Sequence, residues 1–252
     1  MQRRFQKEIK WLLQEKYQGK LTRAATRDIA KLQKGEHVDY LIGFVEFAGC
    51  CIDVSQKPLI PRPETEYWTQ KAIEELRRLP KEDLGIRCLD IFAGSGCVGI
   101  AVLKHILQAH VDFAEQERKF LKQILVNLKK NHIPGKRFRV IRSDIFSEIS
   151  LKYDYIFANP PYVAESRKRS VQPSVLKHEP SQALFAGKDG LKYIRRFLKG
   201  AKRHLLPGGK IYMEFDSPQK REIEKLLGQC SYSSWQFHKD QYRKYRFVVI
   251  SS

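Results

Sequence analysis

Four consecutive residues, Asn159-Pro160-Pro161-Tyr162, combine groups that could hold a planar amino group. Adjacent prolines fix φ and lack backbone N–H donors, so the turn is stiff and its carbonyls have no intrinsic partner. The Asn159 side-chain oxygen and the Pro160 carbonyl could each accept one N–H from an –NH2 group, and Tyr162 could pack against a flat neighbour. These residues predict a catalytic pocket that orients an amide or exocyclic amino nitrogen.

Such a nitrogen is a weak nucleophile, so its methylation by a sulfonium depends on alignment. In-line positioning could lower the barrier by about 7–11 kcal/mol. No general base is needed before attack, because the proton becomes acidic only once the nitrogen is alkylated. The alternative is an Asn-Pro turn that merely ends a strand, but this tetrad directly follows an apolar stretch and lies 65 residues after Gly94.

A glycine-rich loop that starts at Asp90 follows a predicted strand and opens a predicted helix. Gly94, Gly96 and Gly99 match the G-x-G-x-x-G fingerprint of dinucleotide-binding folds. Asp112, 18 residues after Gly94, lies where an acid would hold a ribose hydroxyl. Asp90 would repel a pyrophosphate at the helix N-terminus but suits a ligand that carries an ammonium and a sulfonium. We therefore favour S-adenosylmethionine over a nicotinamide dinucleotide.

The elements that must position these residues alternate between strand and helix from residue 86 onward. This alternation predicts an α/β fold with a doubly wound, mostly parallel sheet and helices on both faces. Ligands of such sheets bind at the carboxyl ends of the strands, where both the glycine loop and the proline turn fall. Strands are expected at 86–91, 110–113, 138–141, 153–158 and 210–215, helices at 97–108, 114–131, 189–205 and 217–228, and a terminal antiparallel pair at 233–237 and 246–251.

The chain before the sheet divides into two shorter parts. Residues 1–36 predict a short helical segment of about two helices, and residues 37–60, with glycines among apolar residues, predict a β-hairpin linker. A proline-rich connector then leads into a helix expected at Glu64–Leu79. The catalytic domain is therefore expected to span residues 61–252.

Composition limits the classes of protein to consider. The 252 residues, 42% hydrophobic and 30% charged, exclude wholesale disorder and lack a stretch apolar enough to span a membrane. The net charge of +19 favours either a nucleic-acid-related partner or simply a basic solvated surface. Five scattered cysteines and the absence of a signal-peptide pattern indicate the reducing cytoplasm, and the seven histidines show no metal-ligand spacing.

The glycine loop and the Asn-Pro-Pro-Tyr turn together resemble class I S-adenosylmethionine-dependent amino-methyltransferases. Further motifs narrow the resemblance, over about residues 40–252, to HemK-type protein-glutamine N5-methyltransferases. These motifs are Tyr40-x-x-Gly43-x-x-x-Phe47, Leu59-Ile-Pro-Arg-Pro-Glu-Thr-Glu66, Glu179-Pro-x-x-Ala183-Leu, Gly187-Lys-Asp-Gly-Leu191 and Leu206-Pro-Gly-Gly-Lys-Ile-Tyr-Met-Glu214.

The resemblance implies a Rossmann-like, seven-stranded, mostly parallel sheet and S-adenosyl-L-methionine as cofactor. It implies transfer of a methyl group to the side-chain amide nitrogen, N5, of the glutamine in the Gly-Gly-Gln motif of peptide-chain release factors. A sister branch modifies a ribosomal protein, but the Pro-Arg-Pro-Glu-Thr-Glu stretch resembles the release-factor branch. The basic surface could additionally contact RNA or the ribosome.

The resemblance also assigns site residues. Asn159 would contact both the cofactor and the glutamine. The cofactor-binding set comprises Asp90, Phe92, Ala93, Gly94, Ser95, Gly96, Asp112 for the ribose, and Asp144 and Phe146 beside the adenine. The substrate-binding set comprises Asn159, Pro160, Pro161 and Tyr162, with Arg62 and Glu64 either lining the site or forming an ordinary helix-entry pair.

The sequence departs from the family at three places. The usual glycine at position 92 is Phe, a commonly found Trp is Phe146, and the N-terminal helical part is short. Alternatives that remain open are an adenine-N6 methyltransferase acting on rRNA or DNA, a glutamine methyltransferase of a ribosomal protein, and a non-catalytic basic binding module. Arg167, Lys168 and Arg169 could equally be a solvated loop or a contact for an acidic or RNA-bound partner.

Overall fold

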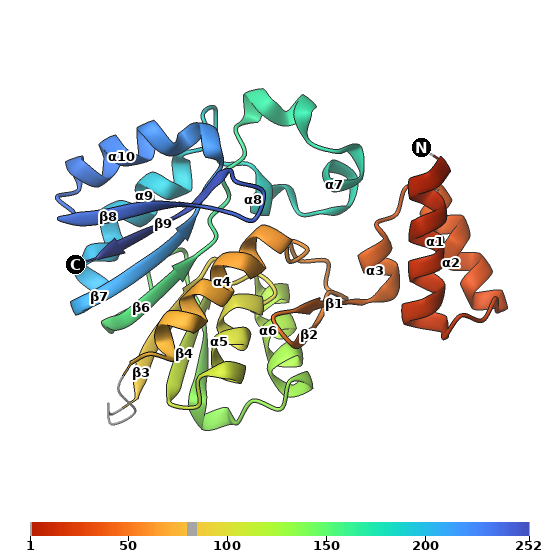
Figure 1. Ribbon diagram of the computed structural model, residues 1–252, viewed down its shortest axis with the longest axis horizontal. Helices are drawn as coiled ribbons and strands as arrows, with labels where there is room; N and C mark the ends of the chain where they lie inside the picture. Colours follow the sequence, from red (N-terminus) through yellow and green to blue (C-terminus); the bar gives the residue numbers. More distant parts are fainter. Residues whose placement is uncertain (1, 80–84, 252) are drawn as a thin grey trace.

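The computed structural model describes residues 2–79 and 85–251 and shows a seven-stranded sheet between two layers of helices (Figure 1). Its strands are β3 (Ile86–Ile91), β4 (Ala109–Glu115), β5 (Phe138–Arg142), β6 (Tyr153–Ala158), β7 (Leu205–Glu214), β8 (Ser234–Lys239) and β9 (Tyr245–Ser251). The strand order is β5-β4-β3-β6-β7-β9-β8. Only β9 pairs antiparallel, with β7 and β8, among these described strands. This topology confirms the predicted doubly wound, mostly parallel α/β fold.

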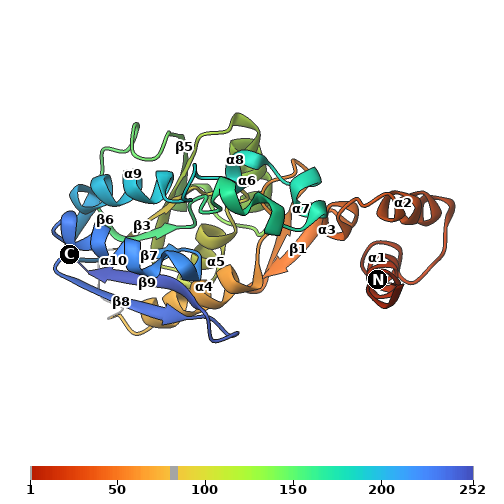
Figure 2. The same cartoon turned by 90° about the horizontal axis from the view of Figure 1, so that it is seen from above.

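Helices pack on both faces of the sheet (Figures 1 and 2). The main helices are α4 (Pro63–Leu76), α5 (Cys97–His105), α6 (Arg118–Lys130), α9 (Lys192–Ala201) and α10 (Lys220–Gln229). Adjacent residues of β3 point to opposite faces, so Cys88 packs in the core formed by α4, α5 and α6, and Leu89 in the core formed by α9 and α10. Burial on both faces explains why the central strands are apolar without alternation.

Several element boundaries differ from the predicted ones. β7 begins five residues before the predicted 210–215 strand, and the register of its pairing with β6 shifts between Leu205, opposite Tyr153, and Lys210, opposite Tyr155. The helix predicted at 189–205 is correspondingly shorter. β4 continues to Glu115, so the helix predicted to begin at 114 begins at Arg118 instead. This last difference changes the candidate site.

Three helices form a small cluster at the N-terminal end of the molecule, which Figure 2 shows beyond one edge of the main body. They are α1 (Gln2–Tyr17), α2 (Arg23–Gln33) and α3 (Val38–Ile42). The sequence predicts the first two but not α3, which lies in the range assigned to the linker and ends at Gly43 with φ of +96°. Leu12, Leu32 and Leu41 pack together, so the helical cluster extends past residue 36.

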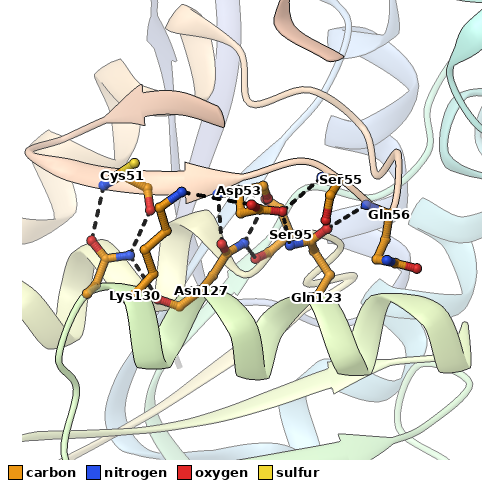
Figure 3. A network of polar contacts seen from close by, with 9 residues as sticks. Cys51, Asp53, Ser55, Gln56, Ser95, Gln123, Asn127 and Lys130 are labelled. Atoms are coloured by element: carbon orange, nitrogen blue, oxygen red, sulfur yellow. Dashed lines mark hydrogen bonds and ion pairs between the residues drawn. The ribbon is translucent and has the colours of Figure 1, made fainter. Parts of the chain in front are cut away.

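The predicted hairpin is present as β1 (Phe44–Phe47) and β2 (Cys50–Asp53), which pair antiparallel. Amide side chains of α6, and that of Asn131 directly after it, bind the free edge of β2 (Figure 3). Asn131 accepts from Cys51 N (3.1 Å) and donates to Cys51 O (2.9 Å), and Asn127 pairs in the same way with the backbone of Asp53 (2.7 and 3.1 Å). Gln123 donates to the Asp53 side chain (3.1 Å). Side chains spaced four residues apart thus provide hydrogen-bond partners for the backbone N–H and C=O groups of β2, as a third strand would.

The segment between β6 and α9 forms short helical turns over the strand ends. They are η2 (Glu165–Ser170), α7 (Pro173–His178) and α8 (Ser181–Leu184), and further single turns are η1 (Gly135–Arg137), η3 (Lys202–His204) and η4 (Ser217–Gln219). Arg167, Lys168 and Arg169 are exposed to solvent, and Arg167 forms an ion pair with Asp216. None of the helices in the described part of the chain is both long and apolar enough to cross a bilayer.

Candidate active site

Two cavities open where the parallel strands end, and both are lined by Asn159. The first cavity measures about 310 Å³ and the second about 370 Å³. The first lining includes Phe92, Gly94, Glu115, Asp144, Pro161 and Tyr193, and the second includes Arg62, Pro160, Tyr162, Leu184 and Glu214. The proline turn is therefore a partition between two spaces, one beside the glycine loop and one beside the Arg62 connector.

The proline turn follows β6 directly, as the sequence predicts. The Asn159 amide nitrogen donates to Thr65 Oγ1 (3.2 Å), and the Tyr162 hydroxyl donates to Glu214 (3.0 Å). Within residues 2–79 and 85–251, no group donates to the Asn159 side-chain oxygen. The turn thus presents an unused acceptor oxygen at the wall between the cavities.

The glycine loop places Phe92 in the left-handed region, with φ of +60°. That conformation explains why glycine is usual at this position in the family that the sequence resembles. The Phe92 ring lines the first cavity and contacts the rings of Tyr193 and Phe197, with both centroid distances 6.2 Å. The side chain therefore adds an aromatic wall that a glycine would lack.

Phe92→Gly should give a more stable protein than Phe92→Ala. Both substitutions remove the ring, but only glycine relieves a left-handed backbone that costs other residues about 1–2 kcal/mol. We expect the free energy of unfolding in urea to be about 1 kcal/mol higher for Phe92→Gly. At a position with negative φ, the alanine variant would be the more stable of the two. A higher free energy of unfolding for Phe92→Ala would therefore contradict the proposal that the backbone at residue 92 is strained.

Asp90, predicted to bind the cofactor, lines neither cavity. Its side chain is buried, and its carboxylate accepts a hydrogen bond from the backbone N–H of Gly99 in α5 (2.9 Å). Burial raises the pKa of Asp90 to about 8. Asp90 thus joins the end of β3 to the first turn of α5, and it gives no reason to prefer a cationic ligand.

Asp90→Asn should flatten the pH dependence of stability. The native pKa of Asp90 lies above the unfolded one, so the native state holds a proton that the unfolded state releases. Between pH 5 and pH 8 the wild-type free energy of unfolding should therefore fall by up to about 1.4 kcal/mol per pH unit. Asparagine accepts the same bond without titrating. If the urea midpoint of unfolding changed with pH by the same amount in the wild type and in Asp90→Asn, the expectation would be contradicted.

Glu115, not Asp112, is the acid at the end of β4. Asp112 lies three residues before the strand end, where its carboxylate accepts from Arg139 and from the Tyr153 hydroxyl (2.7 Å), away from the first cavity. Glu115 lines the first cavity and accepts from Gly94 N (2.8 Å). The structure therefore does not bring Asp112 to the first cavity, because β4 continues two residues past the predicted strand end at residue 113. Glu115, 21 residues after Gly94, fits the expected spacing of about 20 at least as well.

The turn after β5 contributes Asp144 but not Phe146 to the first cavity. Asp144 lines the cavity and pairs with Arg196 (2.8 Å). Phe146, predicted beside the adenine, is buried, stacks on His204 (4.6 Å) and Phe197 (5.6 Å), and does not line the first cavity. Ile145, with φ of +57°, lines the cavity instead.

Arg62, for which the sequence leaves open a place in the site or an ordinary helix-entry pair, lies in the lining of the second cavity and forms an ion pair with the buried Glu179 (2.5 Å). This pair joins the proline-rich connector to the segment that follows the proline turn. Glu64, predicted beside it, lines neither cavity. Its neighbour Glu66 instead accepts from Ala48 N in the hairpin (2.8 Å).

The other residues of the glycine loop lie beneath the first cavity or at the start of α5. Ala93 and Ser95 are buried, and Gly96, with φ of +79°, is the residue before α5. Asn127 donates to Ser95 O (2.9 Å), so the same side chain holds both the hairpin and the loop (Figure 3). Nowhere in the described ranges do three or more His, Cys, Asp or Glu side chains gather to hold a metal ion.

Comparison with known proteins agrees with this geometry. Residues 75–187 match the family described as "Methyltransferase small domain". The 16S rRNA N2 G1207 methyltransferase of T. thermophilus, solved in complex with AdoMet and guanosine, shares the fold with a TM-score of 0.57 and 16% identity, over 83% of this chain and 49% of that one.

Two curated relatives are closer in sequence. The release factor glutamine methyltransferase of Bacteroides thetaiotaomicron is 33% identical over 230 residues, which cover 88% of this chain and 78% of that protein. The release factor glutamine methyltransferase of Streptococcus pneumoniae is 34% identical over 220 residues, which cover 84% and 73%. The chain therefore belongs to the release factor glutamine methyltransferase family.

Proposed function

We propose that this protein transfers a methyl group from S-adenosyl-L-methionine to N5 of the glutamine side chain in the Gly-Gly-Gln motif of a peptide-chain release factor. Membership of the family supports the reaction. One observation carries the assignment of the site: Asn159 lies between two cavities with its nitrogen bonded inward and its oxygen unused. An adenine-N6 methyltransferase and a ribosomal-protein methyltransferase are not favoured by these relatives.

The residues of the first cavity fit S-adenosylmethionine. A ribose diol needs an acceptor such as the Glu115 carboxylate, an adenine amino group suits Asp144, and the backbone at Gly94 leaves room for the methionine part. When bound, the cofactor supplies an electrophilic methyl group on a sulfonium. Phe92 adds an apolar surface to the same cavity.

The second cavity suits the glutamine side chain. The Asn159 oxygen and the Pro160 carbonyl would each accept one N–H of the substrate amide, which holds the nitrogen in place. Tyr162 would pack against the amide plane, and its hydroxyl is held by Glu214. These contacts orient the nitrogen without a general base, and the proton leaves to solvent after transfer.

The experiment that tests this function uses the full chain, labelled S-adenosylmethionine and a purified release factor. We expect one methyl group on the glutamine of the Gly-Gly-Gln motif, located by mass spectrometry. Label in rRNA or DNA but not in the release factor would overturn the proposal. A substrate affinity that falls steeply with added salt would also point to a nucleic-acid substrate.

We further propose a cytoplasmic location and a contact between the basic surface and RNA or the ribosome. The free cysteines Cys50, Cys51, Cys88, Cys97 and Cys230 suit a reducing compartment, and the net charge of +19 suits a polyanion. The N-terminal helical cluster, the β-hairpin and the part of the chain from residue 61 onward would serve as docking segment, linker and catalytic domain. Binding of the chain to purified ribosomes at 50 and 300 mM salt would test the contact.

A further inference from the structure

A buried chain of hydrogen bonds runs from Asn159 into the protein. Thr65 lies in the first turn of α4 and is 2% exposed, and its hydroxyl donates to Glu214 Oε2 (2.7 Å). Glu214 ends β7 and is 1% exposed. The same oxygen accepts from Trp68 Nε1 (2.7 Å), and the other oxygen accepts from the Tyr162 hydroxyl (3.0 Å).

The donors in this series of hydrogen bonds determine which way the Asn159 amide faces. An indole N–H can only donate, so the Glu214 oxygen that it meets must act as an acceptor. An ionised Glu214 carboxylate carries no proton of its own, so the proton between it and the Thr65 hydroxyl is the threonine's, which leaves only lone pairs on the Thr65 oxygen toward Asn159. The Asn159 group that meets those lone pairs must be the NH2, at 3.2 Å. Its oxygen consequently faces the cavities.

A flipped Asn159 amide would be unfavourable on both sides. Its oxygen would face the lone pairs of Thr65, and its NH2 would face the NH2 of the substrate amide. A substrate held by two acceptors requires the observed orientation. Glu214 additionally holds Tyr162, so one carboxylate orients two walls of the second cavity.

We propose that Thr65 and Glu214 are positioning residues for methyl transfer, because they hold the Asn159 amide with its oxygen toward the substrate nitrogen. This inference rests on the proposed function and names residues that act through Asn159 without touching the reacting atoms. Thr65 and Glu214 each lie in a motif of the sequence, but the sequence does not show that the two residues meet, since they lie 149 residues apart.

Thr65→Val tests the proposal, because valine keeps the shape and removes the hydroxyl. We expect kcat on the release factor to fall about 10- to 100-fold, as for the loss of a bond that orients a catalytic group, with the Kd of S-adenosylhomocysteine unchanged within twofold. Thr65→Ser retains the hydroxyl and should restore kcat to within about threefold of wild type. Glu214→Gln, whose oxygen can still accept from Thr65 and Trp68, should retain more than a tenth of kcat.

Thr69→Val is the matched control. Thr69 is buried one turn further along α4, and its hydroxyl donates to the backbone oxygen of Thr65 (2.7 Å), outside the chain to Asn159. This variant should lose stability but keep kcat. Equal losses of kcat in Thr65→Val and Thr69→Val would show a merely structural role, and a Thr65→Val kcat within twofold of wild type would overturn the proposal.

A readout without substrate separates this inference from the proposed function. The signal of the Asn159 side-chain NH2 in ¹H–¹⁵N spectra can be identified because it is missing from Asn159→Asp. The protons of this NH2 should exchange with water slowly in the wild type and in Thr65→Ser, and faster in Thr65→Val. Slow exchange in a wild-type protein that does not methylate release factors would overturn the function and keep the positioning. Equally fast exchange in wild type and Thr65→Val would overturn the positioning.

Discussion

Asn159→Ala should lower kcat by about 10²- to 10³-fold, the scale found when one preorganised polar contact to the reacting group is removed. The substitution deletes the acceptor oxygen that faces both cavities, while Glu115 and Asp144 remain in the first cavity. The Kd of S-adenosylhomocysteine should therefore change by less than about threefold. Single-turnover rates with a release factor, together with calorimetry of the cofactor product, measure the two quantities.

Asn159→Asp is the informative companion variant. It keeps an oxygen at the wall, but it cannot donate to Thr65 and places a second charge near Glu214. We expect a loss of kcat smaller than that of Asn159→Ala, about tenfold or more. If Asn159→Ala retained a fifth of the wild-type kcat, the amide oxygen could not be the group that orients the substrate.

The proline turn could be predicted because its properties are local. Two prolines restrict the backbone whatever surrounds them, and a strand that ends just before Asn159 brings the turn to the ligand edge of the sheet. The fold could be predicted for a related reason, since strands buried on both faces and amphipathic helices leave periodic patterns. Arg62 followed from its place in a motif, and the structure puts it beside the second cavity.

The remaining site residues depend on properties that are not local. Asp90 adjoins the glycine loop in sequence, yet its side chain turns inward to the α5 backbone. Phe146 follows a cavity residue but is drawn into the core by stacking with His204 and Phe197. Thr65 and Glu214 meet only because α4 packs over the end of β7. No short pattern records such contacts between distant segments.

Glu115→Gln should weaken binding of S-adenosylmethionine by about 10²-fold, because a carboxylate that accepts two ribose hydroxyls contributes about 3 kcal/mol more than a neutral group. One Glu115 oxygen accepts from Gly94 N (2.8 Å) and the other from Glu117 N (2.9 Å), and each keeps a lone pair for a ligand. Burial raises the pKa of Glu115 above its usual range. Affinity in the wild type should therefore fall as the pH drops through that pKa, since only the ionised form accepts both hydroxyls.

Asp112→Asn is the matched control, since it makes the same chemical change three residues earlier on β4. Asp112 accepts from Arg139 and Tyr153 away from the first cavity, so its loss should reduce stability and leave the cofactor Kd within about twofold. Calorimetry of both variants with S-adenosylhomocysteine decides between the acids. If Asp112→Asn bound S-adenosylhomocysteine weakly and Glu115→Gln bound it as tightly as the wild type, the ribose would have to be assigned to Asp112. The structure permits that assignment only if β4 ended earlier and its last residues turned away from the sheet.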